Sequence, residues 1–186
     1  MHTHTHRRRF AALAATLLAL AMIPAAAATA GDGGVSSSGD SGSGGGHRCT
    51  NKNHAKLDGG KAIPPCSAPR RVVKVIKAAN EIRHKPYRYG GGHGEWRDSG
   101  YDCSGAVSYA LHGGDLLGKP LDSSGLARWG SRGKGNWITV YAHSGHAYAV
   151  IAGLRWDTSM TKGDGLGWSS ERRSADGYKK RHKGRL

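Results

Sequence analysis

The 186-residue sequence contains no internal repeat, no helix-turn-helix or RNP-like segment, and no Gly-Lys-Ser/Thr after its glycine-rich loop. The lack of repeats excludes a solenoid or a propeller. The lack of a nucleic-acid motif argues against a nucleic-acid regulator, and the missing Gly-Lys-Ser/Thr argues against a phosphate-binding loop. Acidic residues are also few, with 13 Asp and Glu against 28 Lys and Arg, which gives a formal charge of +15. The length allows one domain with appendages.

Residues 1–30 have the organisation of a signal peptide. The basic stretch MHTHTHRRRF precedes the apolar stretch AALAATLLALAMIP, and Ala28-Thr29-Ala30 is an A-x-A cleavage site. The apolar stretch is short for a membrane span, so a retained anchor is the lesser alternative. The general secretory route is the default, although Arg7-Arg8-Arg9-Phe10 also resembles a twin-arginine signal. We therefore expect a secreted, cell-wall-associated bacterial protein.

The positive charge indicates anionic partners outside the cell. Residues 1–30 contain three arginines and no acidic residue, so their removal lowers the charge from +15 to +12. A basic exported protein concentrates on anionic wall polymers or membrane surfaces. Charge alone also fits nucleic acid, but export argues against that partner.

The three cysteines divide into a predicted pair and a free thiol. Cys49 and Cys66 lie in a polar segment, and an oxidising compartment favours a disulfide between them. Such a loop stabilises a fold by about 3 kcal/mol in the chain-entropy model. This pairing leaves Cys103 free. The alternative is a zinc site made of His47, Cys49, His54 and Cys66, but their spacing matches no finger pattern.

The pattern along the chain predicts one folded domain after a linker. Residues 31–46 form a Gly/Ser linker, 47–69 a short segment with the predicted disulfide, and 70–186 the domain. We expect helices over 70–83 and 103–111, a short helix through 126–129 capped by Ser123 or Ser124, and strands over 137–142, 147–151 and 154–158. The basic segment Gly163–Leu186 either wraps the domain or remains a loose tail.

Cys103 lies where a thiol is easily activated. Asp102 is a good N-cap, which makes Cys103 the first residue of the following helix. Unpaired N–H groups and the positive end of the helix dipole lower the pKa of a thiol at this position. A lone buried cysteine is usually structural, but this context predicts a nucleophile.

His146 is the predicted base, because it follows a glycine and begins an apolar strand. The other candidates, His93, His112 and His143, lie in turns or loops. If Ala152-Gly153 is a two-residue hairpin turn, alternation along the strands places Asp157 on the same face as His146, diagonally across from it. Asp157 is then the residue that orients the imidazole. Ser159, directly opposite His146, is the lesser alternative.

Three segments carry a resemblance to a known family. PYRYGG at 86–91, YDCSGAVSYAL at 101–111 and SGHAYAVIAG at 144–153 resemble the NlpC/P60 family of papain-like cell-wall peptidases, over about Val72 to Ser159. The resemblance implies an α+β, papain-like domain in which the nucleophile helix packs on a small antiparallel sheet. The third polar residue of the family is usually His, sometimes Asn or Gln, so Asp157 departs from the pattern.

The resemblance also implies the activity, which is hydrolysis of amide bonds in peptidoglycan stem peptides, by default the D-glutamyl–diamino-acid bond, without metal or organic cofactor. Tyr87 would help the Cys103 N–H hold the oxyanion. Asp102 and Ser104, besides their local capping roles, would bind the amine of a stem peptide. The alternatives are an amidase or acyltransferase on the same fold, and a non-catalytic basic wall-binding protein.

Overall fold

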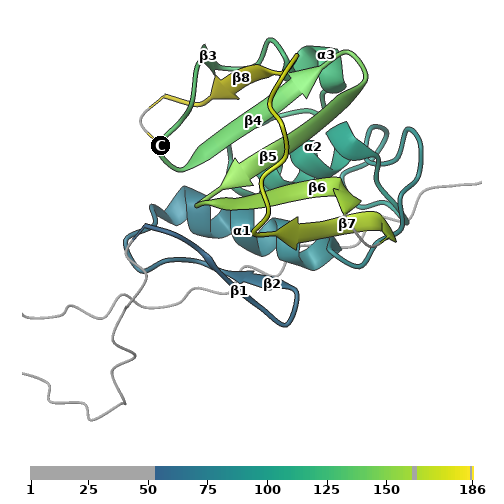
Figure 1. Ribbon diagram of the computed structural model, residues 1–186. Helices are drawn as coiled ribbons and strands as arrows, with labels where there is room; N and C mark the ends of the chain where they lie inside the picture. Colours follow the sequence, from purple (N-terminus) through teal and green to yellow (C-terminus); the bar gives the residue numbers. More distant parts are fainter. Residues whose placement is uncertain (1–52, 161–162, 185) are drawn as a thin grey trace, which may run out of the picture. The chain divides into compact units, whose positions relative to one another are not determined.

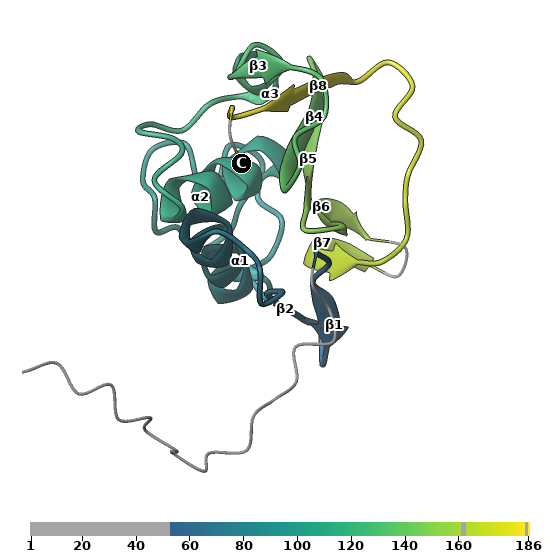
Figure 2. The same ribbon diagram turned by 90° about the vertical axis from the view of Figure 1, so that its left-hand side faces the viewer.

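The computed structural model describes residues 53–160, 163–184 and 186, which all fall within one compact unit (Figure 1). A six-stranded antiparallel sheet has the order β3-β8-β4-β5-β6-β7, and helices α1 and α2 cover one of its faces (Figure 2). The helices are α1 (Arg70–Ile82), α2 (Cys103–Gly113) and α3 (Ser123–Leu126). The large sheet consists of β3 (Ser131–Arg132), β4 (Ile138–His143), β5 (His146–Ile151), β6 (Leu154–Met160), β7 (Gly163–Ser169) and β8 (Lys179–His182). The α+β class with a nucleophile helix on an antiparallel sheet is confirmed.

Helix α1 lies beside α2 on the same face of the sheet (Figure 2). Its apolar residues recur at helical spacing, so one face carries the buried Val72, Val75, Ile76 and Ala79. That face packs against α2. The helix ends at Ile82, one residue before the predicted end and ahead of Pro86, whose ring disfavours a helical conformation in the residue before it.

Helix α2 is buried on nearly every side, because it lies between α1 and strands β5 and β6. It begins at Cys103, and the side chain of Asp102 accepts a hydrogen bond from the Gly105 N–H, as the sequence predicts. On the sheet side, the indole of Trp156 donates to the carbonyl of Ala106 over 3.1 Å. These contacts fix the position of the thiol relative to the sheet.

The turn between β5 and β6 has the predicted two residues. Ile151 pairs with Leu154, and both turn residues have positive φ, +45° at Ala152 and +86° at Gly153. A turn of this kind matches the right-handed twist of the strands it joins. The predicted parity of the hairpin is therefore confirmed.

The C-terminal segment is part of the sheet, not a tail. Strand β7 pairs with β6, and β8 inserts between β3 and β4. The connection between them, residues 170–178, is called the strap below. It crosses the face of the sheet opposite α1 and α2 (Figures 1 and 2). Neither strand has a sequence typical of β structure, since β7 reads GDGLGWS and β8 reads KKRH.

Two local features differ from the sequence predictions. The short helix α3 is capped by Asp122, whose side chain accepts from the Gly125 N–H over 2.6 Å, and not by Ser123 or Ser124. The helix also ends at Leu126, whereas the sequence predicted that it continues through residues 126–129. A carboxylate accepts a hydrogen bond from a helix N-terminus at least as well as a hydroxyl does.

A short hairpin precedes the main domain. Strands β1 (Lys56–Asp58) and β2 (Lys61–Ile63) pair with each other, and the side chain of Asn80 bonds both backbone groups of Ala62. The N–H of Ala55 donates to the carbonyl of Ala152 over 2.7 Å, which joins the hairpin to the β5–β6 turn.

Several sequence predictions lie outside the described residues. These are the signal peptide, the linker, and the cysteine partner predicted for Cys66, namely Cys49. The disulfide therefore stays a prediction, and so does the zinc alternative, which needs His47 and Cys49. Within 53–160, 163–184 and 186, no helix has the length and apolar character to cross a membrane.

Candidate active site

Cys103 is a free thiol at the N-terminus of α2, and its residue is 9% exposed. Burial raises the pKa of this thiol, but hydrogen bonds from the His146 side chain, the Ala147 N–H and the Ser123 hydroxyl outweigh it, so the pKa lies below its ordinary value. The Sγ atom is 3.7 Å from the Ser123 Oγ. The helix N-terminus acts in the same direction. The thiol is therefore predisposed to ionise.

His146 is the first residue of β5 and lies beside the thiol. Its Nε2 atom is 2.9 Å from Asp157 Oδ1. Because Nε2 bonds the carboxylate, Nδ1 is the nitrogen left to interact with Cys103. Burial lowers the pKa of His146, yet the hydrogen bonds and negative charges of Asp157 and Cys103 raise it to about 9. The site favours an imidazolium next to a thiolate.

Asp157 lies in β6, and its side chain is fully buried. Besides the bond to His146, Oδ1 accepts from the backbone N–H groups of Thr158 and Ser159, over 2.8 and 3.1 Å. The β6–β7 pairing shifts register between Asp157 and Ser159, which turns both N–H groups toward the carboxylate. Burial raises the pKa of Asp157, but the bonds from His146, Ser159 and Arg173 hold it below its usual value. Asp157 is thus a carboxylate aimed at the imidazole.

Arg173 is a member of the site that the sequence did not reveal. It comes from the strap, and its Nη1 atom donates to Asp157 Oδ2 over 2.9 Å and lies 3.1 Å from His146 Nε2. A guanidinium only donates hydrogen bonds. The positive charge of Arg173 close to Nε2 therefore disfavours protonation of His146, whereas the carboxylate of Asp157 favours it. Its Cζ atom also lies 5.4 Å from the Tyr148 ring centre and 5.7 Å from that of Tyr178.

Asp102 and Ser104 lie in a closed hydrogen-bond network around the helix N-terminus. The Asp102 carboxylate accepts from the Gly90 N–H over 3.1 Å and from the Ser104 hydroxyl over 3.0 Å, in addition to Gly105. His93 Nε2 is 3.0 Å from Asp102 Oδ1 and 3.2 Å from Ser104 Oγ. These bonds hold the glycine-rich loop against α2. The capping roles are observed, whereas the predicted role in binding substrate stays a proposal.

Tyr87 lies at the mouth of the site. It is 43% exposed and forms an isolated bridge with Tyr101, next to the capping residue. Burial raises the pKa of its phenol, and the negative charges of Cys103 and Asp102 raise it further. An open pocket beside it is lined by Pro86, Tyr87, His146, Thr158 and Ser159. The pocket therefore borders His146, the hydrogen-bond partner of Cys103.

The arrangement is suited to acyl transfer through a thiol. A nucleophile, a base hydrogen-bonded to an orienting carboxylate, and a backbone N–H at a helix N-terminus are the groups that this reaction uses. In the described part of the chain, no three side chains of His, Cys, Asp or Glu form a group that could hold a metal ion. The geometry corresponds to the papain-like type, in which the thiol comes from a helix and the imidazole from a strand.

No family model and no curated protein matches the chain. Several solved structures do match the chain. The peptidoglycan hydrolase RipB of Mycobacterium tuberculosis is 23% identical, with 64% of this chain and 68% of that chain covered and a TM-score of 0.49. The P60 domain of an antigen of M. avium subspecies paratuberculosis is 20% identical, with 60% and 94% covered and a TM-score of 0.48.

A further similar structure is RipD of M. tuberculosis, described as a non-catalytic NlpC/p60 domain protein adapted to peptidoglycan binding. It is 18% identical, with 62% of this chain and 98% of that chain covered and a TM-score of 0.46. These are NlpC/P60 domain proteins, the family that the sequence motifs resemble. At such low identities and TM-scores, the likeness carries no conclusion about activity or substrate.

Proposed function

We propose that the protein is an exported cysteine peptidase that hydrolyses amide bonds in peptidoglycan stem peptides. The observation that supports this proposal most directly is the hydrogen-bonded series of Cys103, His146 and Asp157, with the thiol at a helix N-terminus. The resemblance of the three sequence motifs to the NlpC/P60 family supplies the substrate class. RipB, one of the similar structures, is described as a peptidoglycan hydrolase.

In this mechanism the Cys103 thiolate attacks the carbonyl carbon of the amide, and the Cys103 N–H and the Tyr87 hydroxyl hold the oxyanion. The His146 imidazolium gives its proton to the leaving amine as the C–N bond breaks, which leaves a thioester. His146, now neutral, takes a proton from water, and the hydroxide attacks the thioester. The C–S bond breaks, the new carboxylic acid leaves, and the thiolate–imidazolium pair is restored.

The residues around this pair have supporting roles in the proposal. Asp157 holds the imidazole with Nδ1 toward the thiol and stabilises its positive charge. Asp102 and Ser104, which line the start of α2, would meet the amine of a stem peptide. By the family default, the bond that is cut is the D-glutamyl–diamino-acid bond.

Mass spectrometry of purified peptidoglycan incubated with the full chain tests the proposal. Hydrolysis yields fragments with one new amine and one new carboxylate, and the Cys103→Ala variant yields none. With an added amine, an acyltransferase would instead give an amide of that amine. Binding without fragments would make the protein a non-catalytic peptidoglycan-binding domain, as RipD is described to be.

A further inference from the structure

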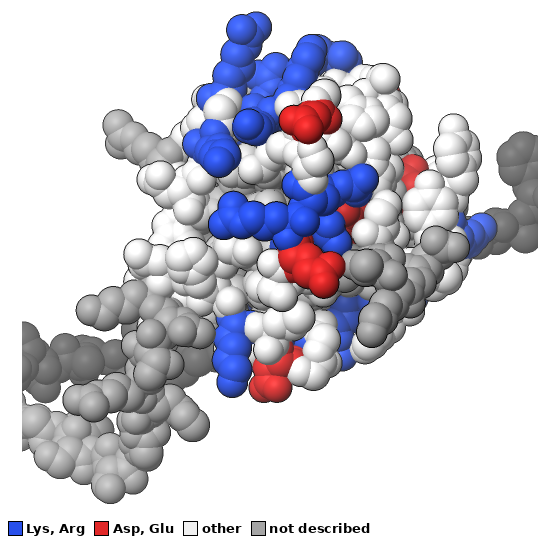
Figure 3. Space-filling view, viewed as in Figure 1, with Lys and Arg blue, Asp and Glu red and all other residues white. Residues whose placement is uncertain are grey.

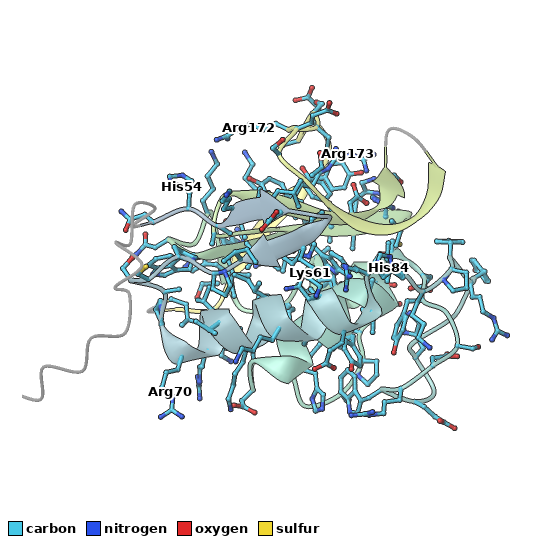
Figure 4. All side chains as sticks on the ribbon, turned by 90° about the horizontal axis from the view of Figure 1, so that it is seen from below. His54, Lys61, Arg70, His84, Arg172 and Arg173 are labelled. Atoms are coloured by element: carbon cyan, nitrogen blue, oxygen red, sulfur yellow. The ribbon has the colours of Figure 1, made fainter. Side chains whose placement is uncertain are left out.

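A second pocket is lined by residues of the strap and of strands β4, β5, β6 and β8. The strap crosses the face of the sheet away from α1 and α2 (Figure 2). The volume of the pocket is about 160 Å³. The charged side chains that line it are five cations and one acid, namely Lys134, Arg155, Arg172, Arg173, Lys180 and Glu171. Lys and Arg gather over β8 and over the strap on this face (Figure 3). Arg172 and Arg173 lie in the strap, on the side of the sheet away from α1 (Figure 4).

Arg155 is the buried base of this pocket. It lies in β6, and its side chain is 8% exposed. Its Nε atom is fully buried and has no hydrogen-bond acceptor among the described residues. The nearest carboxylate oxygen, Asp157 Oδ2, is 3.8 Å away, which is beyond hydrogen-bond distance. Burying a guanidinium costs several kcal/mol unless hydrogen bonds and an opposite charge compensate it.

Asp157 alone does not compensate for the buried charge of Arg155. The same carboxylate already accepts hydrogen bonds from His146 and from Arg173. One negative charge therefore faces three groups that carry or can carry positive charge. The pocket retains an excess of positive charge, and Arg155 Nε is one of two buried side-chain nitrogens that lack an acceptor within the described residues, the other being Arg83 Nε.

The size of the pocket limits what can occupy it. Pockets for drug-sized ligands start at about 300 Å³. A small tetrahedral anion fits this space, and the guanidinium group binds phosphate oxygens with paired donors.

We propose that this pocket binds a single phosphate-type oxyanion, with Arg155 as its buried anchor and Arg172 at its rim. The phosphate is either a free ion or monoester, or one unit of a phosphodiester polymer. The thiol does not line this pocket, which shares Arg173 with the active site, and the pocket beside His146 is lined by Pro86, Tyr87, Thr158 and Ser159 instead. The proposal does not depend on the peptidase activity.

The test is a titration of the purified full chain with inorganic phosphate at constant ionic strength, followed by the melting temperature and by the ¹⁵N-labelled Arg Nε–H resonances. We expect a saturable rise of the melting temperature and a shift of the Arg155 resonance. Arg155→Met removes the anchor and weakens binding at least tenfold. Arg172→Gln weakens it about threefold to tenfold, and Glu171→Gln strengthens it, because the charge next to the anion changes in opposite directions.

Arg70→Gln is the matched control for Arg172→Gln. It removes the same charge from α1, on the other side of the sheet (Figure 4), and should leave phosphate binding unchanged. Equal losses in the Arg70 and Arg172 variants, or a response to phosphate that does not saturate, would mean diffuse electrostatic attraction and would overturn the site. If Arg155→Met fails to fold, the opposite effects of the Arg172 and Glu171 variants still decide the question.

A parallel titration with glycerol-phosphate oligomers identifies the source of the phosphate. Tighter binding of the oligomer, lost in Arg172→Gln but kept in Arg70→Gln, assigns the site to a phosphodiester polymer. Binding of inorganic phosphate alone assigns it to a free ion or monoester. Failure of both probes rejects the proposal and leaves the peptidase proposal untouched.

Discussion

His146 and Asp157 form a hydrogen bond of 2.9 Å across two adjacent strands, between Nε2 and Oδ1. The turn at Ala152 and Gly153 sets the register that brings them to the same face of the sheet. Because side chains alternate along a strand, a turn one residue longer would place Asp157 on the opposite face. The orientation of the imidazole is therefore fixed by backbone pairing as well as by the hydrogen bond.

The lowered pKa of Cys103 predicts an unusual reactivity of the thiol. Iodoacetamide should label native Cys103 faster than a free thiol at neutral pH, and the rate should fall only as the pH drops through the lowered pKa. His146→Ala removes the main hydrogen bond and charge that stabilise the thiolate, so its labelling profile should move to higher pH. The urea-unfolded protein is the reference for an ordinary thiol.

Activity should follow the ionisation of both groups. The thiolate and the imidazolium coexist between the lowered pKa of Cys103 and the pKa of His146, at about 9. We expect a bell-shaped profile of kcat/KM whose alkaline limb lies near that value. Cys103→Ala should abolish turnover with a nearly unchanged melting temperature, since only one small group is removed. Residual turnover above a few per cent would contradict a thiol mechanism.

Asp157→Asn should lower kcat/KM by about 10-fold to 10⁴-fold, because an amide stabilises the imidazolium less than a carboxylate does. Ser159→Ala is the matched control. Ser159 reaches Asp157 through its backbone N–H, so loss of its hydroxyl should leave activity near the wild-type level. The double variant of His146→Ala and Asp157→Asn should lose far less than the product of the single losses. The reverse result for Ser159 and Asp157 would make Ser159 the orienting residue.

Asp157→Asn should also destabilise the fold at neutral pH, by about 3 kcal/mol, because Arg173 and Arg155 lose their shared negative charge. The native pKa of Asp157 is lowered below 3.8, so its contribution to stability is present above that pH. This contribution of Asp157 to stability is lost as the pH falls through its native pKa. The difference in unfolding free energy between the wild type and the variant should therefore shrink below about pH 4. Urea unfolding from pH 7 to pH 2.5 measures it.

Gly105→Ala should weaken both fold and activity. A methyl group there would meet the carbonyl oxygen of Gly91, which accepts the Asp102 N–H over 3.2 Å. We expect about 2 kcal/mol of destabilisation and a lower kcat, because the displaced loop carries Tyr87. Gly118→Ala has open space around the added methyl and should change stability by less than about 0.5 kcal/mol. Equal effects in the two variants would mean that the contact with Gly91 is unimportant.

Peptide mapping tests the cysteine assignment. Non-reducing digestion of protein recovered from an oxidising compartment should link Cys49 to Cys66 and leave Cys103 as a thiol. A major product with Cys103 in a disulfide would contradict the assignment, and so would one zinc ion bound per chain.

Short-range sequence patterns were sufficient to predict the local parts of the site. Asp102 caps a helix that begins at Cys103, and the Ala152-Gly153 turn sets the parity of the hairpin that carries His146 and Asp157. Each of these features depends on residues a few positions apart, for which capping and alternation are sufficient rules. The α+β class followed from the same short-range patterns together with the family resemblance.

The remaining features depend on contacts between segments that lie far apart in the sequence. Strands β7 and β8 have glycine-rich or cationic sequences, and they are strands because β6 and β4 offer them backbone partners. Arg173 reaches Asp157, 16 positions earlier in the chain, because the strap crosses the sheet. No spacing rule covers such a contact, since an arginine in a polar segment is usually solvated. The sequence therefore predicted the thiol and its base, while long-range backbone pairing decided which cations surround the carboxylate.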